Sequence, residues 1–291
     1  MLLQRILTAL VLAAVAISAI FLLPILYFYL FIAVIVLIAA WEWTNLVEIN
    51  KVSGKLGFLL LLIVPMLGVT FWTQLLELTS QVFEWPEIKE YSGALEWLVI
   101  GPVVFWVMMM ILIRKVPEGL LAIELKTSFK VFIGWFVLLS AWMFLTKLRA
   151  YYGADAVMYF LALIWIADIA AYFTGKKFGK DKLAPAISPG KTVQGMYGAI
   201  ISAMLCALAL TLYYGYPMMI ATDFGMLSIL TVLVSIYGDL FFSLMKRKSG
   251  VKDSGSILPG HGGVLDRIDS VIAAAPFYYA GVILIGRSVF A

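Results

Sequence analysis

Long runs of apolar residues dominate this chain, and short polar segments separate them. A run of about 20 apolar residues is long enough to cross the roughly 30 Å hydrocarbon layer of a bilayer as an α-helix. The pattern predicts nine such spans, at residues 5–23, 25–47, 56–74, 94–113, 129–148, 154–175, 193–214, 216–242 and 268–288. We therefore expect an all-α polytopic membrane protein with about nine transmembrane helices.

The first predicted span has one alternative interpretation, a cleaved signal peptide. Ala14-Val15-Ala16 is a weak cleavage-like sequence of small residues. A second apolar run begins directly after Pro24, however, and would have to form the new N-terminus. We therefore favour a span that is retained.

The basic residues of the polar segments indicate the orientation of the chain. Cytoplasmic loops of membrane proteins carry an excess of Lys and Arg. With the N-terminus in the cytoplasm, only four of the 21 basic residues fall outside: Lys89, Lys147, Arg149 and Arg287. Moving the count by one helix would reverse every later loop and remove this bias. The bias therefore supports nine spans, a cytoplasmic N-terminus and a C-terminus outside.

The spans also suggest how the chain is organised. Residues 1–92 hold about three transmembrane helices, and residues 93–291 hold about six, which we expect to carry the chemistry. In this second part, cytoplasmic loops are predicted at 176–192 and 243–267. Segment 74–93 is rich in Glu and is predicted to be an outside loop.

Composition narrows the class of protein and the kind of site. The chain is 64% hydrophobic and 13% charged, with a mean hydropathy of +1.03, whereas soluble domains are about half apolar and a quarter charged. One cysteine and one histidine exclude an internal disulfide framework and a His-rich zinc site. A divalent metal would need carboxylate ligands, which suits Mg²⁺. We read the pI near 9.0 as basic cytoplasmic loops and expect no nucleic-acid partner.

The acidic residues are divided along the chain. All Glu residues lie between Glu42 and Glu124, and all Asp residues lie between Asp155 and Asp269. Because Asp is a common ligand of hard metals, this division indicates that the second half carries the chemistry.

Three aspartates at the ends of the last two predicted helices are the candidate metal ligands. Asp266 and Asp269 are three residues apart at the start of the last helix, so their carboxylates lie on one face. Asp239 ends the preceding helix on the other side of the loop. Three converging carboxylates would hold a cation and would repel one another without it. The alternative is that they pair with nearby basic residues and cap the helix.

Asp168 lies deeper in an apolar run, after Trp165-Ile166-Ala167. An acid inside a membrane span is costly and often functional. Its alternative role is that of an intramembrane hydrogen-bond partner.

The two cytoplasmic loops also have the composition of a phosphate-binding site. Glycines let backbone N–H groups approach an anion closely, and the second loop holds Gly260, Gly262 and Gly263. The candidate phosphate-binding cations are Lys191, Lys246, Arg247 and Lys252. The alternative for Lys246-Arg247-Lys248 is an interfacial anchor.

The sequence SPGKT at 188–192 resembles the end of a nucleotide P-loop. The first glycine of that pattern would fall at Pro185, so we exclude a P-loop ATPase. We keep Ser188, Lys191 and Thr192 as candidate phosphate contacts.

Two further features have both a functional and a structural interpretation. His261 is the one side chain that titrates near neutral pH without a large perturbation, so it could donate to a phosphate; its alternative is loop hydrogen bonding. The tryptophans Trp41, Trp43, Trp72 and Trp85 are interpreted as membrane-interface aromatics rather than a platform for stacking bases.

Residues 243–269 resemble the signature of the phosphatidate cytidylyltransferases, the CDP-diacylglycerol synthases. The resemblance rests on Ser243, Lys246-Arg247, Lys252-Asp253, Pro259-Gly260-His261-Gly262-Gly263 and Asp266-Arg267-Ile268-Asp269. Residues 168–195 also resemble the family, through the D-x-x-A-Y-x-x-G opening and SPGKT. Gln194 stands where some members carry Glu, so we assign it no acidic role. The resemblance covers roughly the second half of the chain.

The resemblance implies that CTP and phosphatidic acid react to give CDP-diacylglycerol and pyrophosphate. It implies catalytic roles for Asp239, Lys246, Arg247, Lys252, His261, Asp266 and Asp269. It implies substrate-binding roles for Asp168, Ser188, Lys191, Thr192, Ser243, Asp253, Gly262, Gly263 and Arg267. We expect Asp239, Asp266 and Asp269 to hold Mg²⁺, with a second cation nearby as an alternative to a single ion.

Two other classes of function remain as alternatives. A CTP-dependent lipid-alcohol kinase of the polyprenol or phytol type would move the γ-phosphoryl group and release CDP. A cation-coupled transporter would place its acids opposite one another in mid-helix, whereas most acids here lie at cytoplasmic helix ends. We expect a multi-pass protein of the bacterial plasma (inner) membrane with its active site facing the cytoplasm. Its expected partners are the two substrates and the lipid bilayer, with a homodimer as an alternative to a monomer.

Overall fold

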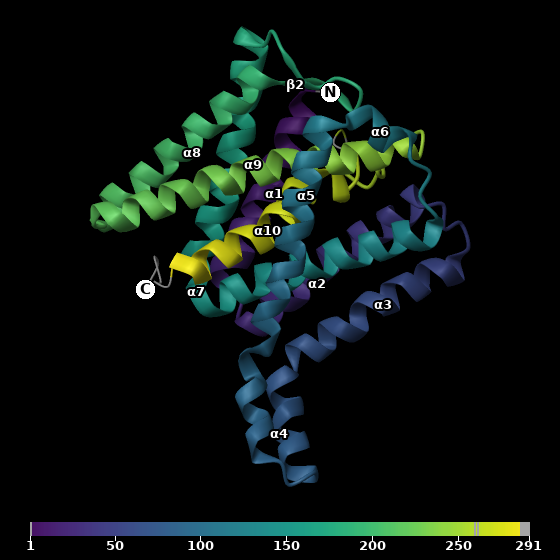
Figure 1. Ribbon diagram of the computed structural model, residues 1–291, viewed down its shortest axis with the longest axis vertical. Helices are drawn as coiled ribbons and strands as arrows, with labels where there is room; N and C mark the ends of the chain where they lie inside the picture. The colour runs from purple at the N-terminus through teal and green to yellow at the C-terminus, as the bar shows by residue number, and fades with distance from the viewer. Residues whose placement is uncertain (1, 259, 261, 286–291) are drawn as a thin grey trace.

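The computed structural model describes residues 2–258, 260 and 262–285, and helices make up most of this part (Figure 1). The helices are α1 (Leu2–Leu22), α2 (Ile25–Leu46), α3 (Val52–Thr70), α4 (Trp72–Val82), the 3₁₀ helix η1 (Pro86–Val99), α5 (Ile100–Lys115), α6 (Pro117–Ala122), α7 (Thr127–Phe178), α8 (Val193–Tyr214), α9 (Met218–Lys248) and α10 (Leu265–Ile285). Two short strands, β1 (Lys182–Ala184) and β2 (Ser188–Thr192), lie between α7 and α8.

Seven helices of the described part are long and apolar enough to cross a membrane. One of them, α7, has 52 residues, which at about 1.5 Å per residue is more than twice the thickness of the hydrocarbon layer. The helix is broken at Gly153, whose φ of 83° and ψ of −175° are not helical. A positive φ is readily available to glycine, so this residue ends one apolar helix and starts the next. As far as the described residues reach, helices thus lie over every predicted span, whereas the number of crossings stays a prediction.

The segment predicted as an outside loop, residues 74–93, is largely helical. It forms the end of α4 and the start of η1, which pack against each other. In Figure 1 this pair extends away from the other helices at the bottom of the view. A search for long apolar spans misses these elements, because α4 is short and its hydrophobic positions are interrupted by polar ones.

Two boundaries near the predicted cytoplasmic loops also differ from expectation. The strands β1 and β2 pair antiparallel, Lys182 opposite Thr192 and Ala184 opposite Ser188, and form a short hairpin in the predicted loop of an otherwise all-α fold. In addition, α9 continues to Lys248 rather than ending near residue 242. Lys246, Arg247 and Lys248 form its last turn, and basic residues there interact favourably with the helix dipole. The helix therefore continues beyond the apolar residues.

The core is formed where α2, α7, α9 and α10 pack together. Trp43 of α2 is fully buried, and its indole Nε1 donates to the carbonyl oxygen of Lys130, 3.2 Å away. Its ring stacks on Phe241 of α9 with 6.5 Å between ring centroids. The interpretation of Trp43 as an interface aromatic is therefore wrong. This packing joins α2 to the second half of the chain, whereas the division at residue 92 stays a prediction.

Candidate active site

A polar cavity of about 250 Å³ lies among α7, α9, α10 and the loop before α10. Helix α7 contributes Ile164, Trp165 and Asp168, and α9 contributes Asp239 and Lys246. The loop and α10 contribute Asp253, Asp266, Arg267, Asp269, Ser270 and Val271. Five carboxylates and two cations therefore face one space, and Asp239, Asp266 and Asp269 are among its lining residues.

Close packing of α9 against α10 brings the aspartates of the two helices together. Gly238 precedes Asp239, and a Cβ atom added at Gly238 would lie 2.3 Å from Cβ of Ala273. It would also lie 3.3 Å from the carbonyl oxygen of Asp269. Small residues at such contacts let helix backbones approach each other closely in a membrane.

Gly238→Ala is expected to destabilise the protein by about 1–3 kcal/mol and to lower any activity of the cavity, because the added methyl group forces α9 and α10 apart. Gly225→Ala on the same helix is the matched control, since a Cβ there meets nothing within 4 Å. The control is expected to be neutral or slightly stabilising. Thermal unfolding in detergent measures both. An equal effect of the two substitutions would contradict the packing role, and Ala273→Gly should rescue Gly238→Ala.

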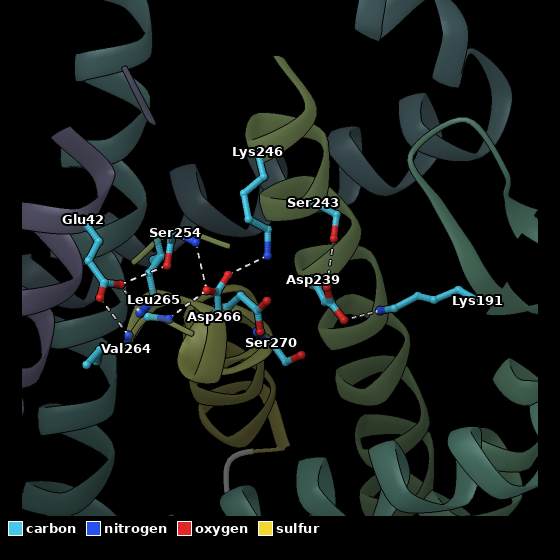
Figure 2. Close-up of polar contacts among 12 residues, drawn as sticks. Glu42, Lys191, Asp239, Ser243, Lys246, Ser254, Val264, Leu265, Asp266 and Ser270 are labelled. Atoms are coloured by element: carbon cyan, nitrogen blue, oxygen red, sulfur yellow. Dashed lines mark hydrogen bonds and ion pairs between the residues drawn. The ribbon is translucent and has the colours of Figure 1, made fainter. Parts of the chain in front are cut away.

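Lys191 reaches Asp239 from the β1–β2 hairpin. Its Nζ lies 2.6 Å from Oδ2 of Asp239 and donates to the carbonyl oxygen of Ile236 at 3.2 Å. The hydroxyl of Ser243 donates to the other oxygen, Oδ1 of Asp239, at 3.3 Å. The carboxylate of Asp239 is thus held by a cation and a hydroxyl at the edge of the cavity (Figure 2).

Hydrogen bonds to the first turn of α8 fasten the hairpin that carries Lys191. The side-chain Oε1 of Gln194 accepts from the backbone N–H groups of Lys180 and Asp181, at 3.0 and 3.2 Å. Its Nε2 donates to Oδ2 of Asp181 at 2.7 Å, a bond that a Glu carboxylate could not make. Thr192 caps α8 by accepting from the N–H of Gly195 at 3.1 Å.

Asp266 is the most extensively hydrogen-bonded carboxylate of the cavity. Its Oδ1 accepts from Nζ of Lys246 at 2.6 Å, and its Oδ2 accepts from the backbone N–H groups of Ser254 and Gly263 at 2.9 and 3.0 Å. Figure 2 shows these bonds converging on the first turn of α10. Both oxygens of Asp266 are therefore engaged by donors of the protein itself.

Asp269 lies one turn further along α10 and is only 7% exposed. Its Oδ1 accepts from the backbone N–H of Ser270 at 2.8 Å. Asp266 and Asp269 both line the cavity, so their spacing of three residues places them on one helix face, as predicted.

The donor set of the cavity is suited to Mg²⁺, with a difference from the expected trio. Within the described residues, no group of three carboxylates is arranged to hold a metal ion. Magnesium usually binds through one or two carboxylates together with substrate phosphates, so a three-carboxylate cage is not needed. Asp239 and Asp269 line the cavity and fit this requirement. The donors to Asp239 are two side chains, Lys191 and Ser243, which can turn toward a substrate, whereas Oδ2 of Asp266 accepts from two backbone N–H groups that are fixed in place. The assignment of metal ligands stays a prediction.

Several predicted site residues lie near the cavity without lining it. Arg247 donates through Nε to the carbonyl oxygen of Ile187 at 3.3 Å and so holds the hairpin. Lys252 is exposed, and Thr192 acts as a helix cap. Ser188 pairs within the hairpin, and Gly262 accepts from the N–H of Leu258 through its carbonyl oxygen at 2.9 Å. The predicted His261 lies outside the described residues.

One residue of the site was missed by the sequence analysis. Glu42 of α2 is 1% exposed, and its carboxylate accepts hydrogen bonds from the segment that leads into α10. The signal was an acid between two tryptophans in an apolar span, which is by itself a reason to suspect function.

Comparison with known proteins identifies the family. A family model described as the cytidylyltransferase family matches residues 3–285. This chain belongs to the cytidylyltransferase family. The match runs from α1 to α10, so the cavity and Glu42 both lie in the part shared with other cytidylyltransferases. The family resemblance inferred from residues 243–269 is confirmed.

Individual relatives within the cytidylyltransferase family match nearly the whole chain. A phosphatidate cytidylyltransferase of Pseudomonas aeruginosa is 38% identical over 281 residues, which cover 96% of each chain. A phosphatidate cytidylyltransferase of Haemophilus influenzae is 33% identical over 289 residues, which cover 96% of this chain and 97% of the relative. An uncharacterized protein of Escherichia coli, YnbB, is 38% identical over 174 residues, which cover 56% of this chain and 55% of YnbB.

Proposed function

We propose that this protein transfers the cytidylyl group of CTP to phosphatidic acid and gives CDP-diacylglycerol and pyrophosphate. The observation that carries this proposal is its similarity, over 96% of the chain, to two proteins named phosphatidate cytidylyltransferase. The cavity supports it chemically. Aspartates suit a hard cation, and the Lys and Arg side chains around them suit phosphate groups.

The lysines of the site have a role in binding both substrates. Lys191 and Lys246 each hold a carboxylate at 2.6 Å, so their charges are already located at the cavity. Both substrates bring phosphate oxygens, which compete with Asp239 and Asp266 for the same ammonium donors. We propose that Lys191, Lys246 and Arg267 neutralise the phosphates of CTP and the lipid. The two lysines would act as point charges, and the planar guanidinium of Arg267 could bind two phosphate oxygens at once.

In the proposed reaction, a phosphate oxygen of phosphatidic acid attacks the α-phosphorus of CTP. A new oxygen–phosphorus bond forms, the bond from the α-phosphorus to the bridging oxygen breaks, and pyrophosphate leaves with that electron pair. A phosphate monoester is already ionised near neutral pH, so the protein needs no strong base. Mg²⁺, when bound, supplies neutralisation of the phosphate charge. Asp239 and Asp269 would hold it, and Asp266 would orient Lys246.

We further propose nine crossings of the membrane with the N-terminus in the cytoplasm. This count treats α7 as two crossings divided at Gly153 and α1 as one crossing, beside the other six helices that are long enough by themselves. The excess of basic residues in the loops near the cavity supports a site that faces the cytoplasm. The two relatives come from bacteria, which supports the bacterial inner membrane as the location.

Product analysis with CTP labelled at either the α- or the γ-phosphate tests the reaction. With phosphatidic acid and Mg²⁺, the α-label is expected in the lipid and the γ-label in pyrophosphate, in equal amounts. Chelation of Mg²⁺ by EDTA is expected to lower the rate at least about a hundredfold, and added Mg²⁺ should restore it. A lipid-alcohol kinase needs a hydroxyl acceptor, so in the same assay with a polyprenol or phytol in place of phosphatidic acid it would put the γ-label into the lipid and release CDP. A transporter would give no labelled product with either lipid.

A further inference from the structure

Glu42 connects the N-terminal helices to the segment that carries the aspartates of α10. Its Oε2 accepts from the hydroxyl of Ser254 at 2.9 Å and from the backbone N–H of Leu265 at 2.8 Å. Its Oε1 accepts from the backbone N–H of Val264 at 3.0 Å. Figure 2 shows Glu42 on the opposite side of the first turn of α10 from Asp239 and Lys191. One carboxylate therefore binds both ends of the loop from Ser254 to Leu265.

The loop is shaped to let this carboxylate approach. A Cβ atom added at Gly263 would lie 2.3 Å from Oε2 of Glu42, and one added at Gly255 would lie 2.5 Å from Oε1. Both distances are shorter than any contact that a real Cβ atom makes, so a larger residue at either position would push the carboxylate out. The Gly-Gly pair of the signature thus makes room for a side chain of α2, in addition to any role it has with phosphate.

The way in which Glu42 is buried points to a purpose beyond packing. No Lys or Arg of the described residues forms an ion pair with it, and it is almost completely shielded from solvent. A buried carboxylate is costly unless hydrogen bonds compensate it. Here the compensation comes from the N-terminus of α10, where free N–H groups and the helix dipole favour a negative charge. Within the described residues, the side-chain hydrogen bonds of Glu42 all go to this one segment.

The same segment also binds Asp266. The N–H groups of Ser254 and Gly263, next to the donors that Glu42 uses, both donate to Oδ2 of Asp266. Asp266 in turn holds Lys246 at 2.6 Å. A shift of the first turn of α10 would therefore move Asp266, Lys246 and Asp269 together within the cavity.

We propose that Glu42 is a positioning residue of the cytidylyl-transfer site. It fixes the N-terminus of α10 and thereby sets where Asp266 and Asp269 meet the cation and the phosphates. The inference rests on the proposed function for its catalytic consequence. It also gives the N-terminal helices a part in the site, because α2 supplies the side chain that holds the loop in place.

Glu42→Gln is the direct test, because it keeps the shape of the side chain and turns one acceptor into a donor that faces an N–H group. Removal of an outer partner of a metal site costs about 10- to 100-fold in activity or metal affinity. We expect kcat to fall by about 30-fold and the Mg²⁺ concentration for half-maximal rate to rise by about tenfold. Mg²⁺-dependent binding of labelled CTP, measured by equilibrium dialysis, should weaken in parallel.

Glu48→Gln is the matched control, since Glu48 is an exposed glutamate just after the end of the same helix. A merely structural Glu42 would lower the unfolding temperature and the folded fraction, but the folded molecules would keep the normal kcat and Mg²⁺ midpoint. That result, or wild-type values throughout, would overturn the proposal. If the wild-type protein forms no liponucleotide, the proposed function fails, while the dialysis experiment still tests the role of Glu42.

Ser254→Ala gives a second, milder test, which as a single variant does not depend on how well Glu42→Gln folds. It removes one donor to Glu42 and keeps the backbone N–H that binds Asp266. We expect a loss in kcat of about fivefold and a double variant no worse than Glu42→Gln alone, because groups that act through one contact are not additive. Strictly multiplicative losses would contradict the proposed chain of contacts.

Discussion

Asp269→Asn is expected to lower turnover by about a thousandfold or more while the protein still folds. Asn has the same shape and keeps an oxygen that can accept from the N–H of Ser270, so the first turn of α10 should persist. The substitution removes one negative charge from a group that is 7% exposed and faces the cavity. Loss of a cation ligand removes several kcal/mol of transition-state stabilisation, which corresponds to at least this factor in rate.

The matched control for Asp269→Asn is Asp223→Asn. Asp223 is an exposed aspartate near the start of α9, whereas Asp239 lies toward the end of that helix. It should leave turnover unchanged. Both variants are purified in detergent, checked for folding by thermal unfolding, and assayed for labelled CDP-diacylglycerol at saturating Mg²⁺. A rate near the wild-type value for Asp269→Asn would show that this carboxylate is not part of the reaction site.

Lys246→Met is expected to lower turnover by about a hundredfold, since it removes a positive charge from the proposed phosphate-binding site. It also leaves Asp266, whose side chain is 5% exposed, without its cation. Breaking a buried ion pair by removing one partner costs about 3–5 kcal/mol of stability. We therefore expect a clear fall in unfolding temperature together with the loss of activity.

The double variant Lys246→Met with Asp266→Asn separates these two effects. It removes both charges, so the unfolding temperature is expected to recover toward that of the wild type while activity stays lost. Lys115→Met, at an exposed lysine in the last turn of α5, is the control for general loss of positive charge and should be active. Activity that recovers together with stability would show that Lys246 has only a structural role.

The features predicted correctly from the sequence are those that local helix geometry determines. Asp266 and Asp269 share a face because three residues are close to one helical turn, and the structure places both at one cavity. Asp239 joins them because α9 and α10 are neighbours in sequence and in space. The positions of the apolar helices followed from where the sequence has apolar runs of about 20 residues.

The features that the sequence did not reveal depend on contacts between distant segments. Glu42 binds Ser254 and Val264, which lie 212 and 222 residues further along the chain, and no periodicity reports such a contact. Trp43 could not be recognised as buried, because positions that face lipid and positions that face other helices are equally apolar in a membrane protein. The pairing of Lys191 with Asp239 likewise depends on how the hairpin folds back onto α9.

We propose that Asp239 and Asp269 hold a hard cation in the cavity and that CTP reacts there. Electron paramagnetic resonance of Mn²⁺, a paramagnetic substitute for Mg²⁺ that prefers the same oxygen ligands, measures the bound cation directly. With CTP present, the wild-type protein is expected to bind Mn²⁺ saturably, and Asp239→Asn and Asp269→Asn should each lose this binding, whereas Asp223→Asn should keep it. Undiminished Mn²⁺ binding in either cavity variant would show that the replaced aspartate does not hold the cation.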